Sequence, residues 1–336
     1  MLLKKMYKLM FLTMVITGTL ISISSYSWMG MWMGLEINLL SMMPLMSDNK
    51  SPHSTESSLK YFIIQALASM ILLFSIIAAS TSSIFSMNNE IMLIMNSALM
   101  TKMGMAPFHF WFPEIIDGLN WLNCFIMLTW QKIAPMLLMI TNMASMSFIN
   151  MIILISMTIG GIMGLNQTSL RKILVYSSIN HMGWMMMALS TNETIWWIYM
   201  MTYTLISMIL IYQFNSNKIF TISQLIPSMK LNTTNKISSM INFFSLGGLP
   251  PFIGFLPKWL VINKMIENNF IATTIIAVML TLITLYFYSR IMFPTFTMNE
   301  TTSNISKPKN EVWLINMFNS INLLGLPLCT IMTSLL

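Results

Sequence analysis

The residues best suited to chemistry are charged side chains that interrupt long apolar runs. Glu36 lies inside a mostly apolar stretch, and so do Lys102, Lys132 and Lys258. A charge at the bilayer centre costs about 2.5–3.5 kcal/mol on insertion scales, so such side chains usually face the protein interior or a water-filled cavity. Snorkelling from a helix end is the alternative, and it is strongest for Lys258, which closes its run.

A buried lysine beside a carboxylate has the chemistry of a proton relay. Loss of water lowers the pKa of a buried ammonium group, and a nearby carboxylate raises it. At about 4 Å and an effective dielectric constant of about 20, the carboxylate contributes about 4 kcal/mol, or roughly three pKa units. A carboxylate that moves can therefore switch the lysine between holding and releasing a proton. A static ion pair that only fixes helix register is the alternative.

One histidine adds a group that titrates near neutral pH. His181, in the stretch Asn180-His181-Met182-Gly183-Trp184, lies in the middle of another apolar run. It fits a proton relay and a hydrogen-bonded core histidine equally well.

A helix-breaking motif, Gly-x-x-Pro-Phe-x-x-x-x-Pro, occurs twice. Proline removes a backbone hydrogen bond and clashes with the preceding turn, so both runs should be broken or bent. A break within lipid must be buried in protein or line a polar cavity. Lys102 precedes the first break and Lys258 follows the second, which favours an ion path over packing kinks. The predicted break residues are Gly104, Pro107, Gly248, Pro250 and Pro251.

A bundle of membrane-spanning helices would position these residues. The 336-residue chain is 56% hydrophobic and 8% charged, whereas a soluble domain carries about 25% charged residues. This excludes an ordinary cytosolic enzyme and a disordered chain, and the basic residues form no stripe suited to nucleic acid. A spanning helix needs about 20 mostly apolar residues, which predicts an all-α polytopic protein with about eleven spans. The expected spans are approximately 6–24, 28–46, 59–80, 90–108, 122–141, 148–165, 172–190, 194–214, 237–257, 270–292 and 312–334.

The distribution of basic residues predicts the topology of these spans. With alternating connectors, thirteen of the 17 basic residues collect on the N-terminal side and only Lys264 on the other. The positive-inside rule therefore places the N-terminus in the positive compartment and the C-terminus opposite. The two motif copies fall five spans apart, so equivalent spans point in opposite directions. This predicts one transmembrane domain, 1–336, with inverted repeats at approximately 6–141 and 148–292 and an extra helix at approximately 312–334.

The two cysteines, Cys124 and Cys329, both lie in apolar runs. Two thiols cannot hold an Fe–S cluster, and no Gly-rich nucleotide loop is present, so a redox centre would belong to a partner. The 40 methionines spread along every apolar run, which favours an apolar filling role over a metal-binding surface.

Several longer stretches carry a resemblance to a known family. They are Trp32-Met-Gly-Leu-Glu36-Ile-Asn38, Lys60-Tyr-Phe, Lys102-Met-Gly-Met-Ala-Pro107-Phe-His109, Thr129-Trp-Gln-Lys132-Ile-Ala-Pro135, Gly164 to Trp184, and Leu246 to Trp259. They resemble the antiporter-like membrane subunits of mitochondrial NADH:ubiquinone oxidoreductase, respiratory complex I. The methionine-rich composition suits an AT-rich mitochondrial genome with a reassigned Met codon, and the resemblance implies an invertebrate source.

The resemblance implies an inverted-repeat antiporter-like bundle with two broken helices. It further implies that Glu36 pairs with Lys102, that Lys132 links two half-channels, and that Lys258 serves the second broken helix. His181 falls in a family stretch with a less secure role in proton transfer.

The resemblance also implies a location and partners. The chain would lie in the mitochondrial inner membrane, with its N-terminus in the matrix and its C-terminus in the intermembrane space. Its partners would be neighbouring antiporter-like subunits, other complex I subunits and phospholipids, and it would bind no nucleic acid. It would carry no cofactor or metal itself, with FMN, Fe–S clusters and ubiquinone held by partner subunits. The rival functions are a stand-alone cation/proton antiporter and a non-conducting spacer that transmits conformational change.

Overall fold

The computed structural model is almost entirely α-helical over the residues it describes. These are 2–47, 51–81, 88–143, 146–231 and 233–297, with the single residues 320, 322, 323, 325, 327 and 330. The chain divides into two compact units, Met1–Ile152 and Ile153–Leu336. The predicted last span, 312–334, lies almost wholly outside the described residues.

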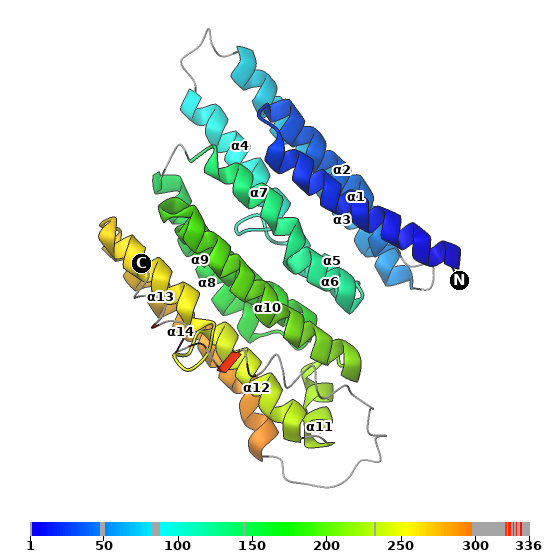
Figure 1. The fold of residues 1–336 in the computed structure, drawn as a ribbon, viewed down its shortest axis with the longest axis vertical. Coiled ribbons are helices and arrows are strands. Elements are labelled where there is room, and N and C mark those ends of the chain that lie inside the picture. Colours follow the sequence, from blue (N-terminus) through cyan, green and yellow to red (C-terminus); the bar gives the residue numbers. More distant parts are fainter. Residues whose placement is uncertain are drawn as a thin grey trace. The chain divides into compact units, whose positions relative to one another are not determined.

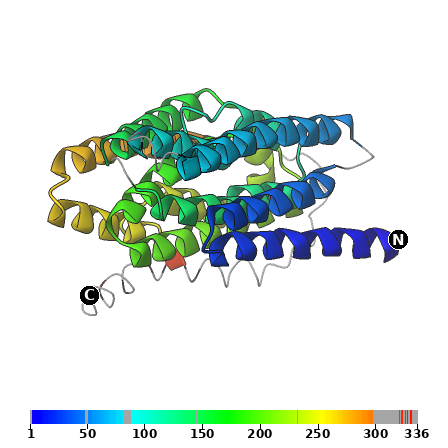
Figure 2. The ribbon, with the colours of Figure 1, turned by 90° about the horizontal axis from the view of Figure 1, so that it is seen from above.

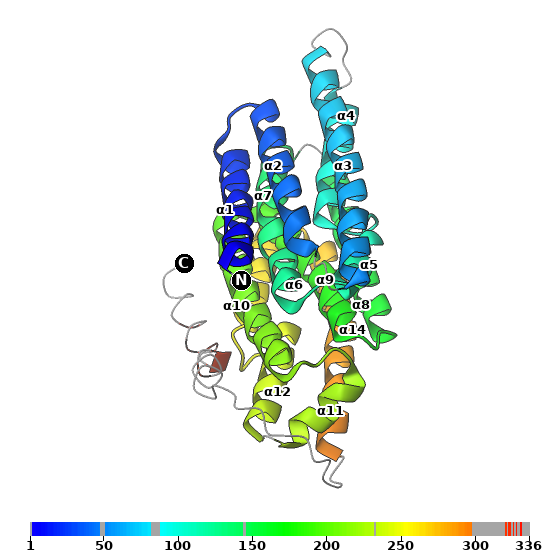
Figure 3. The same cartoon turned by 90° about the vertical axis from the view of Figure 1, so that its right-hand side faces the viewer.

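The described residues of the first unit form seven helices, together with the first part of α8 (Figure 1). Helix α2 packs against both α1 and α3, and α4 packs against α3 and α7. Figure 2 shows α1 and α2 running side by side, and Figure 3 shows the same for α3 and α4. The helices are α1 (Leu2–Ser24), α2 (Trp28–Met46), α3 (Pro52–Thr81), α4 (Asn88–Met103), α5 (Trp111–Asp117), α6 (Trp121–Leu128) and α7 (Trp130–Ile140).

Helix α9 forms the core of the second unit. Almost every residue from Leu170 to Leu189 is buried, including Ser177, Asn180 and His181. Helices α10 and α13 pack directly against α9, and α14 packs against α11, α12 and α13. The helices are α8 (Met146–Leu165), which runs across the division between the units, α9 (Leu170–Thr191), α10 (Glu193–Asn217), α11 (Ile222–Leu231), α12 (Thr233–Gly247), α13 (Phe255–Glu267) and α14 (Ile271–Thr297).

Six helical segments in the described ranges are long and apolar enough to cross a membrane. On α1, α3 and α14 most of this length is not buried, which fits contact with lipid. Helix α9 is not among the six, because its polar residues lower its mean hydropathy; most of these residues lie inside the unit. The count of eleven spans stays a prediction. The six segments are Met6–Ser24, Pro52–Thr81, Trp121–Ile140, Met146–Leu165, Glu193–Asn217 and Ile271–Pro294.

Three expected spans are not single continuous helices. The stretch 90–108 loses its helix after Met103, and the stretch 237–257 loses it after Gly247. In both, the helix ends at a glycine with positive φ. Gly104 lies three residues before Pro107, and Gly248 lies two residues before Pro250. The stretch 122–141 consists of two helices, α6 and α7, that meet at Thr129.

Two glycines allow α1 and α2 to approach closely. An ideal Cβ built on Gly34 would lie 2.7 Å from the Cα of Ser22 and 2.8 Å from the carbonyl oxygen of Gly18. These atoms are backbone, so they cannot rotate away as a side chain would. The packing of the N-terminal helix thus depends on a missing side chain, as small-residue helix contacts in membranes generally do.

We therefore expect Gly34→Ala to separate α1 from α2. Overpacking of this kind costs about 1–3 kcal/mol, so the assembled protein should unfold at a lower temperature. The control is Gly161→Ala on α8, where the new Cβ would meet its nearest neighbour at an ordinary 3.4 Å. Equal thermal stability of the two variants in detergent would contradict the close-packing interpretation.

Candidate functional site

The first predicted break is a helix that ends in a Schellman motif. Gly104 adopts the left-handed conformation, with φ of 72°, and its N–H donates to the carbonyl of Thr101 at 3.1 Å. The N–H of Met105 donates to the carbonyl of Met100, also at 3.1 Å. These two bonds satisfy carbonyls that the end of α4 would otherwise leave open. Pro107 lies in the connection that follows, before α5 begins.

Lys102 lies in the last turn of α4 and is 7% exposed. It interacts electrostatically with Glu36 of α2. No ion pair within 4.0 Å joins these two groups in the described ranges. The buried Oε1 of Glu36 also has no hydrogen-bond partner there. The structure thus brings the two charges within electrostatic range without fixing them in a closed pair.

Lys132 is buried at the start of α7 and is only 1% exposed. Its Nζ lies 5.2 Å from the centre of the Phe112 ring, within cation–π range. We expected this lysine within a continuous span, but it follows the α6–α7 junction at Thr129. Pro135 has no N–H, so it cannot donate to the carbonyl of Gln131, four residues back. At the start of α7 the N–H of Lys132 donates to the carbonyl of Thr129, three residues back, at 3.3 Å.

A reciprocal amide pair lies beside these charges. The Nδ2 of Asn38 donates to Gln131 Oε1 at 3.0 Å, and the Nε2 of Gln131 donates to Asn38 Oδ1 at 2.9 Å. Asn38 lies two residues after Glu36, and Gln131 directly precedes Lys132. The pair therefore fixes the position of the Glu36 segment relative to the Lys132 segment within the first unit.

The second predicted break repeats the backbone geometry of the first. Gly248 has φ of 79°, and its N–H donates to the carbonyl of Ser245 at 3.0 Å. The N–H of Leu249 donates to the carbonyl of Phe244 at 3.3 Å, which completes a second Schellman motif. Pro250 and Pro251 follow directly, and helical structure resumes with α13.

Lys258 reaches back from α13 to the end of α12. Its Nζ donates to the carbonyl of Gly247 at 2.8 Å and to that of Leu246 at 3.3 Å. The side chain is 6% exposed, so it does not snorkel out of the unit. An ammonium group at this position satisfies terminal carbonyls and faces the negative end of the helix dipole.

The two breaks match in backbone but differ in the place of the accompanying lysine, which precedes the first break and follows the second. The residue after the closing proline is Lys258 in the second copy and Glu114 in the first. Glu114 is exposed, and its carboxylate lies 3.4 Å from Lys60 Nζ. Lys102 lies in the helix before the first break, two residues before Gly104. The equivalent position in the second copy, two residues before Gly248, is Leu246.

His181 lies on α9 and is 5% exposed. Its Nδ1 and the hydroxyl of Tyr199 on α10 form a hydrogen bond of 2.9 Å. Both residues line a cavity of 10 Å³ that is also lined by Leu246 and Pro257. This is close to the minimum of about 10–15 Å³ that holds one water molecule. His181 is thus both a hydrogen-bonded core residue and a neighbour of the second break.

Sequence reasoning missed the polar partners of the expected residues. Asn38 and Gln131 stand in stretches that drew notice only for their neighbours Glu36 and Lys132, although buried amides near a charge are themselves a signal. Tyr199 gave no signal, because a tyrosine in an apolar run is most often a packing residue. Within the described ranges, no group of three or more His, Cys, Asp or Glu side chains is placed to hold a metal ion.

Buried charges, interrupted helices and apolar outer faces define a membrane protein of the ion-translocating class. Residues 25–284 match the family described as NADH:quinone oxidoreductase/Mrp antiporter, transmembrane. Because this match covers most of the chain, the chain belongs to that family.

Individual relatives and solved structures agree. The chain is 48% identical to NADH-ubiquinone oxidoreductase chain 2 of Anopheles gambiae, over 94% of this chain and 92% of the relative. It is 42% identical to the protein of the same name from Locusta migratoria, over 96% of each. Its fold is similar to a chain of respiratory complex I from Thermus thermophilus, with a TM-score of 0.84 at 22% identity, covering 95% of this chain and 78% of that one. A chain of the Mrp complex from Dietzia has a TM-score of 0.75 at 16% identity, covering 89% and 62%.

The second break offers a matched pair of neighbouring glycines for a test. An alanine at Gly248 would be strained by about 1–2 kcal/mol in the left-handed region. Its Cβ would also lie 2.7 Å from Lys258 Cδ, whereas a Cβ at Gly247 would meet nothing closer than 3.6 Å. We expect Gly248→Ala to lower the thermal stability of the assembled protein and Gly247→Ala to cost much less. The same loss in both variants, measured by thermal shift, would argue against the Schellman assignment.

Proposed function

We propose that this chain is a proton-translocating membrane subunit of respiratory complex I in the mitochondrial inner membrane. Its relatives are named as subunits of NADH-ubiquinone oxidoreductase. The observation that carries the proposal is the burial of three lysines, Lys102, Lys132 and Lys258, in a protein whose outer faces meet lipid. NADH oxidation and ubiquinone reduction, with FMN and Fe–S clusters, take place on partner subunits.

In the first unit, Glu36 and Lys102 form the mobile part of the relay. Their charges interact without a closed ion pair, so a small movement of the carboxylate changes the proton affinity of the lysine. The Asn38–Gln131 pair holds the surrounding helices in place while this happens. Lys132 lies against the Phe112 ring, where a change in the nearby field acts on a group poorly screened by water.

In the second unit, Lys258 and His181 receive and release the proton. Lys258 binds two carbonyls at the end of α12, which stabilise its charged form by hydrogen bonding. The cavity beside Leu246 and Pro257 provides room for one water next to His181. We propose a proton route in the order Glu36, Lys102, Lys132 and then Lys258, with His181 as a further carrier.

The energy needed for each transfer is modest. Moving one charge against a potential of 100 mV requires about 2.3 kcal/mol. One unit of pKa corresponds to about 1.4 kcal/mol, so a lysine must change its proton affinity by only a few pKa units in each cycle. Displacement of one carboxylate by a few ångströms in a medium of low dielectric constant supplies a change of this size.

We also propose the orientation that the positive-inside rule predicts, with the N-terminus in the matrix. The full bundle would have about eleven spans, including the last helix at 312–334. The Schellman ends of α4 and α12 would be the midpoints of two broken helices, an arrangement that fits the backbone geometry of Gly104 and Gly248.

The central test replaces the buried lysine with an apolar side chain of similar size. Lys132→Met should lower the number of protons pumped per NADH oxidised, because the variant cannot hold the proton. Electron transfer from NADH to an artificial acceptor should continue, since the redox centres lie elsewhere. Proton uptake by reconstituted vesicles, measured with a pH-sensitive dye, gives the ratio.

The control for this test is Lys264→Met, which also removes a lysine but at an exposed pair with Glu267, 2.6 Å away. It should leave the pumping ratio unchanged. A non-conducting spacer would tolerate Lys132→Met, Lys102→Met and Glu36→Gln equally well. Full pumping in all three variants would therefore refute the relay and support the spacer.

A separate prediction concerns the hydrogen bond between His181 and Tyr199. Tyr199→Phe removes the hydroxyl and leaves a buried ring nitrogen without this partner, which costs about 1–3 kcal/mol. We expect the pH dependence of proton pumping to shift, because His181 then loses its hydrogen bond with Tyr199. Tyr212→Phe, at an exposed position on α10, is the control. A pH profile identical to wild type in Tyr199→Phe would show that His181 is only a core residue.

A further inference from the structure

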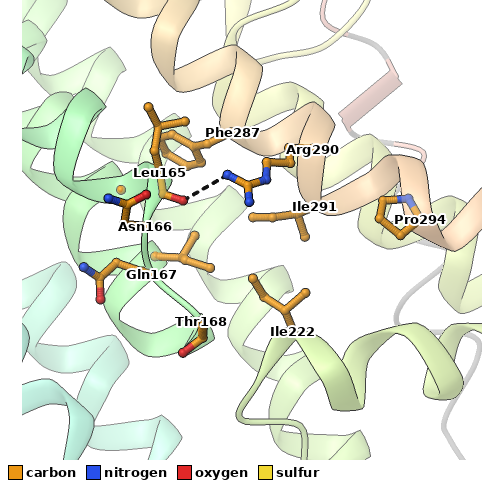
Figure 4. A pocket seen from close by; sticks show the side chains of 11 residues that line it. Leu165, Asn166, Gln167, Thr168, Ile222, Phe287, Arg290, Ile291 and Pro294 are labelled. Carbon is orange, nitrogen blue, oxygen red and sulfur yellow. Dashed lines mark hydrogen bonds between the residues drawn. The ribbon is translucent and has the colours of Figure 1, made fainter.

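The second unit contains a cavity of 390 Å³ at one end of its helices (Figure 4). It lies between the connection that follows α8 and the C-terminal turns of α14. One wall is polar and is formed by Asn166, Gln167 and Thr168. The opposite wall is mostly apolar and is formed by Phe287, Ile291 and Pro294 of α14, with Ile173 and Ile222 beside them.

A guanidinium group stands at the edge of this cavity. Arg290 is exposed, and its Nη1 donates to the carbonyl oxygen of Leu165 at 3.4 Å, as the dashed line in Figure 4 shows. A guanidinium has five N–H donors in a planar fork, so this long bond uses only a small part of its capacity. Asn166, Gln167 and Thr168 add amide and hydroxyl groups on the other side. The cavity therefore combines one fixed positive charge with several neutral donors.

Two of the candidate membrane spans end beside the cavity, one at Leu165 and the other at Pro294. A bilayer has its headgroups at the ends of such spans, so the cavity would lie at headgroup depth. The α8–α9 connection is held there by backbone bonds to a second connection, from Leu170 N–H to Phe220 and from Ile222 N–H to Thr168. The polar wall formed by Asn166, Gln167 and Thr168 therefore belongs to a connection that backbone hydrogen bonds hold in place.

The apolar wall continues onto a surface suited to acyl chains. On α14, Leu282, Tyr286 and Phe293 are exposed, with 57%, 59% and 61% of their surfaces accessible. An occupant that filled the cavity and extended along this surface would need an anionic head and a hydrocarbon body. A phospholipid has both, whereas a free anion would leave the apolar surface uncovered.

We propose that this cavity binds the phosphate of an anionic phospholipid, with Arg290 as its principal charged partner. The guanidinium forms charge-assisted hydrogen bonds to the phosphate oxygens, and Asn166, Gln167 and Thr168 complete the polar contacts. The acyl chains lie along α14. The inference depends only on the membrane location of the chain and is independent of the proton route.

The test uses the native assembly that contains the chain, reconstituted in bilayers doped with a photoactivatable phosphatidylglycerol. After illumination and digestion, mass spectrometry measures the lipid adduct on peptides that cover residues 164–173 and 287–294. Loss of a charge-assisted hydrogen bond is worth about 1.5–3 kcal/mol, so Arg290→Gln should reduce the adduct by about tenfold or more. Asn166→Trp, which fills the cavity without a change in charge, should reduce it as well.

The matched control is Lys218→Gln, which removes one exposed positive charge near the same connections but does not line the cavity. It should leave most of the adduct in place. Equal labelling of wild type and Arg290→Gln would overturn the proposal, and so would equal labelling by photoactivatable phosphatidylcholine. Complete loss of the adduct in millimolar inorganic phosphate would assign the site to a free anion.

Discussion

A helix that ends in apolar surroundings must satisfy its own last carbonyl groups, and this constraint underlies the arrangement of the candidate site. An apolar environment offers no hydrogen bonds, so each open carbonyl costs several kcal/mol. In both units the solution begins with a glycine at positive φ that folds two N–H groups back onto the helix. The second helix adds the ammonium group of Lys258. This contact thus meets a structural need with a charge that we propose to carry a proton.

The buried charges divide into those that are fixed and one pair that is not. Lys258 is held by two carbonyls, and Lys132 lies against an aromatic ring. Glu36 and Lys102 interact across a gap, with no closed ion pair in the described ranges. In a medium of low dielectric constant, a charge pair that can shorten or lengthen changes the local field strongly, whereas a closed pair cannot. The neighbouring amide pair supplies the rigidity against which such a movement takes effect.

The helices also divide into those with apolar outer faces and one whose polar side chains point inward. Helices α1, α3 and α14 present apolar faces, whereas α9 carries its serines, asparagine and histidine inward. Polar residues on α9 therefore do not contradict a membrane location, because other helices of the unit shield them. At the C-terminal end of α14 the apolar surface of the helix meets polar connections, and Arg290 lies at this boundary.

The sequence by itself determined the class of protein, the residues of the candidate relay and the positions where helices stop. Composition and apolar periodicity act locally, and glycine and proline restrict the backbone wherever they occur, so Gly104 and Gly248 could be located without a structure. Tertiary structure alone decided which groups meet. Nothing in the spacing of Asn38 and Gln131, or of His181 and Tyr199, shows that they are partners, because each pair joins different helices. It also decided that Lys258 reaches back to the carbonyl groups at the end of α12. Which side chain reaches a helix end depends on how the helices pack, and the sequence motif fixes only the backbone.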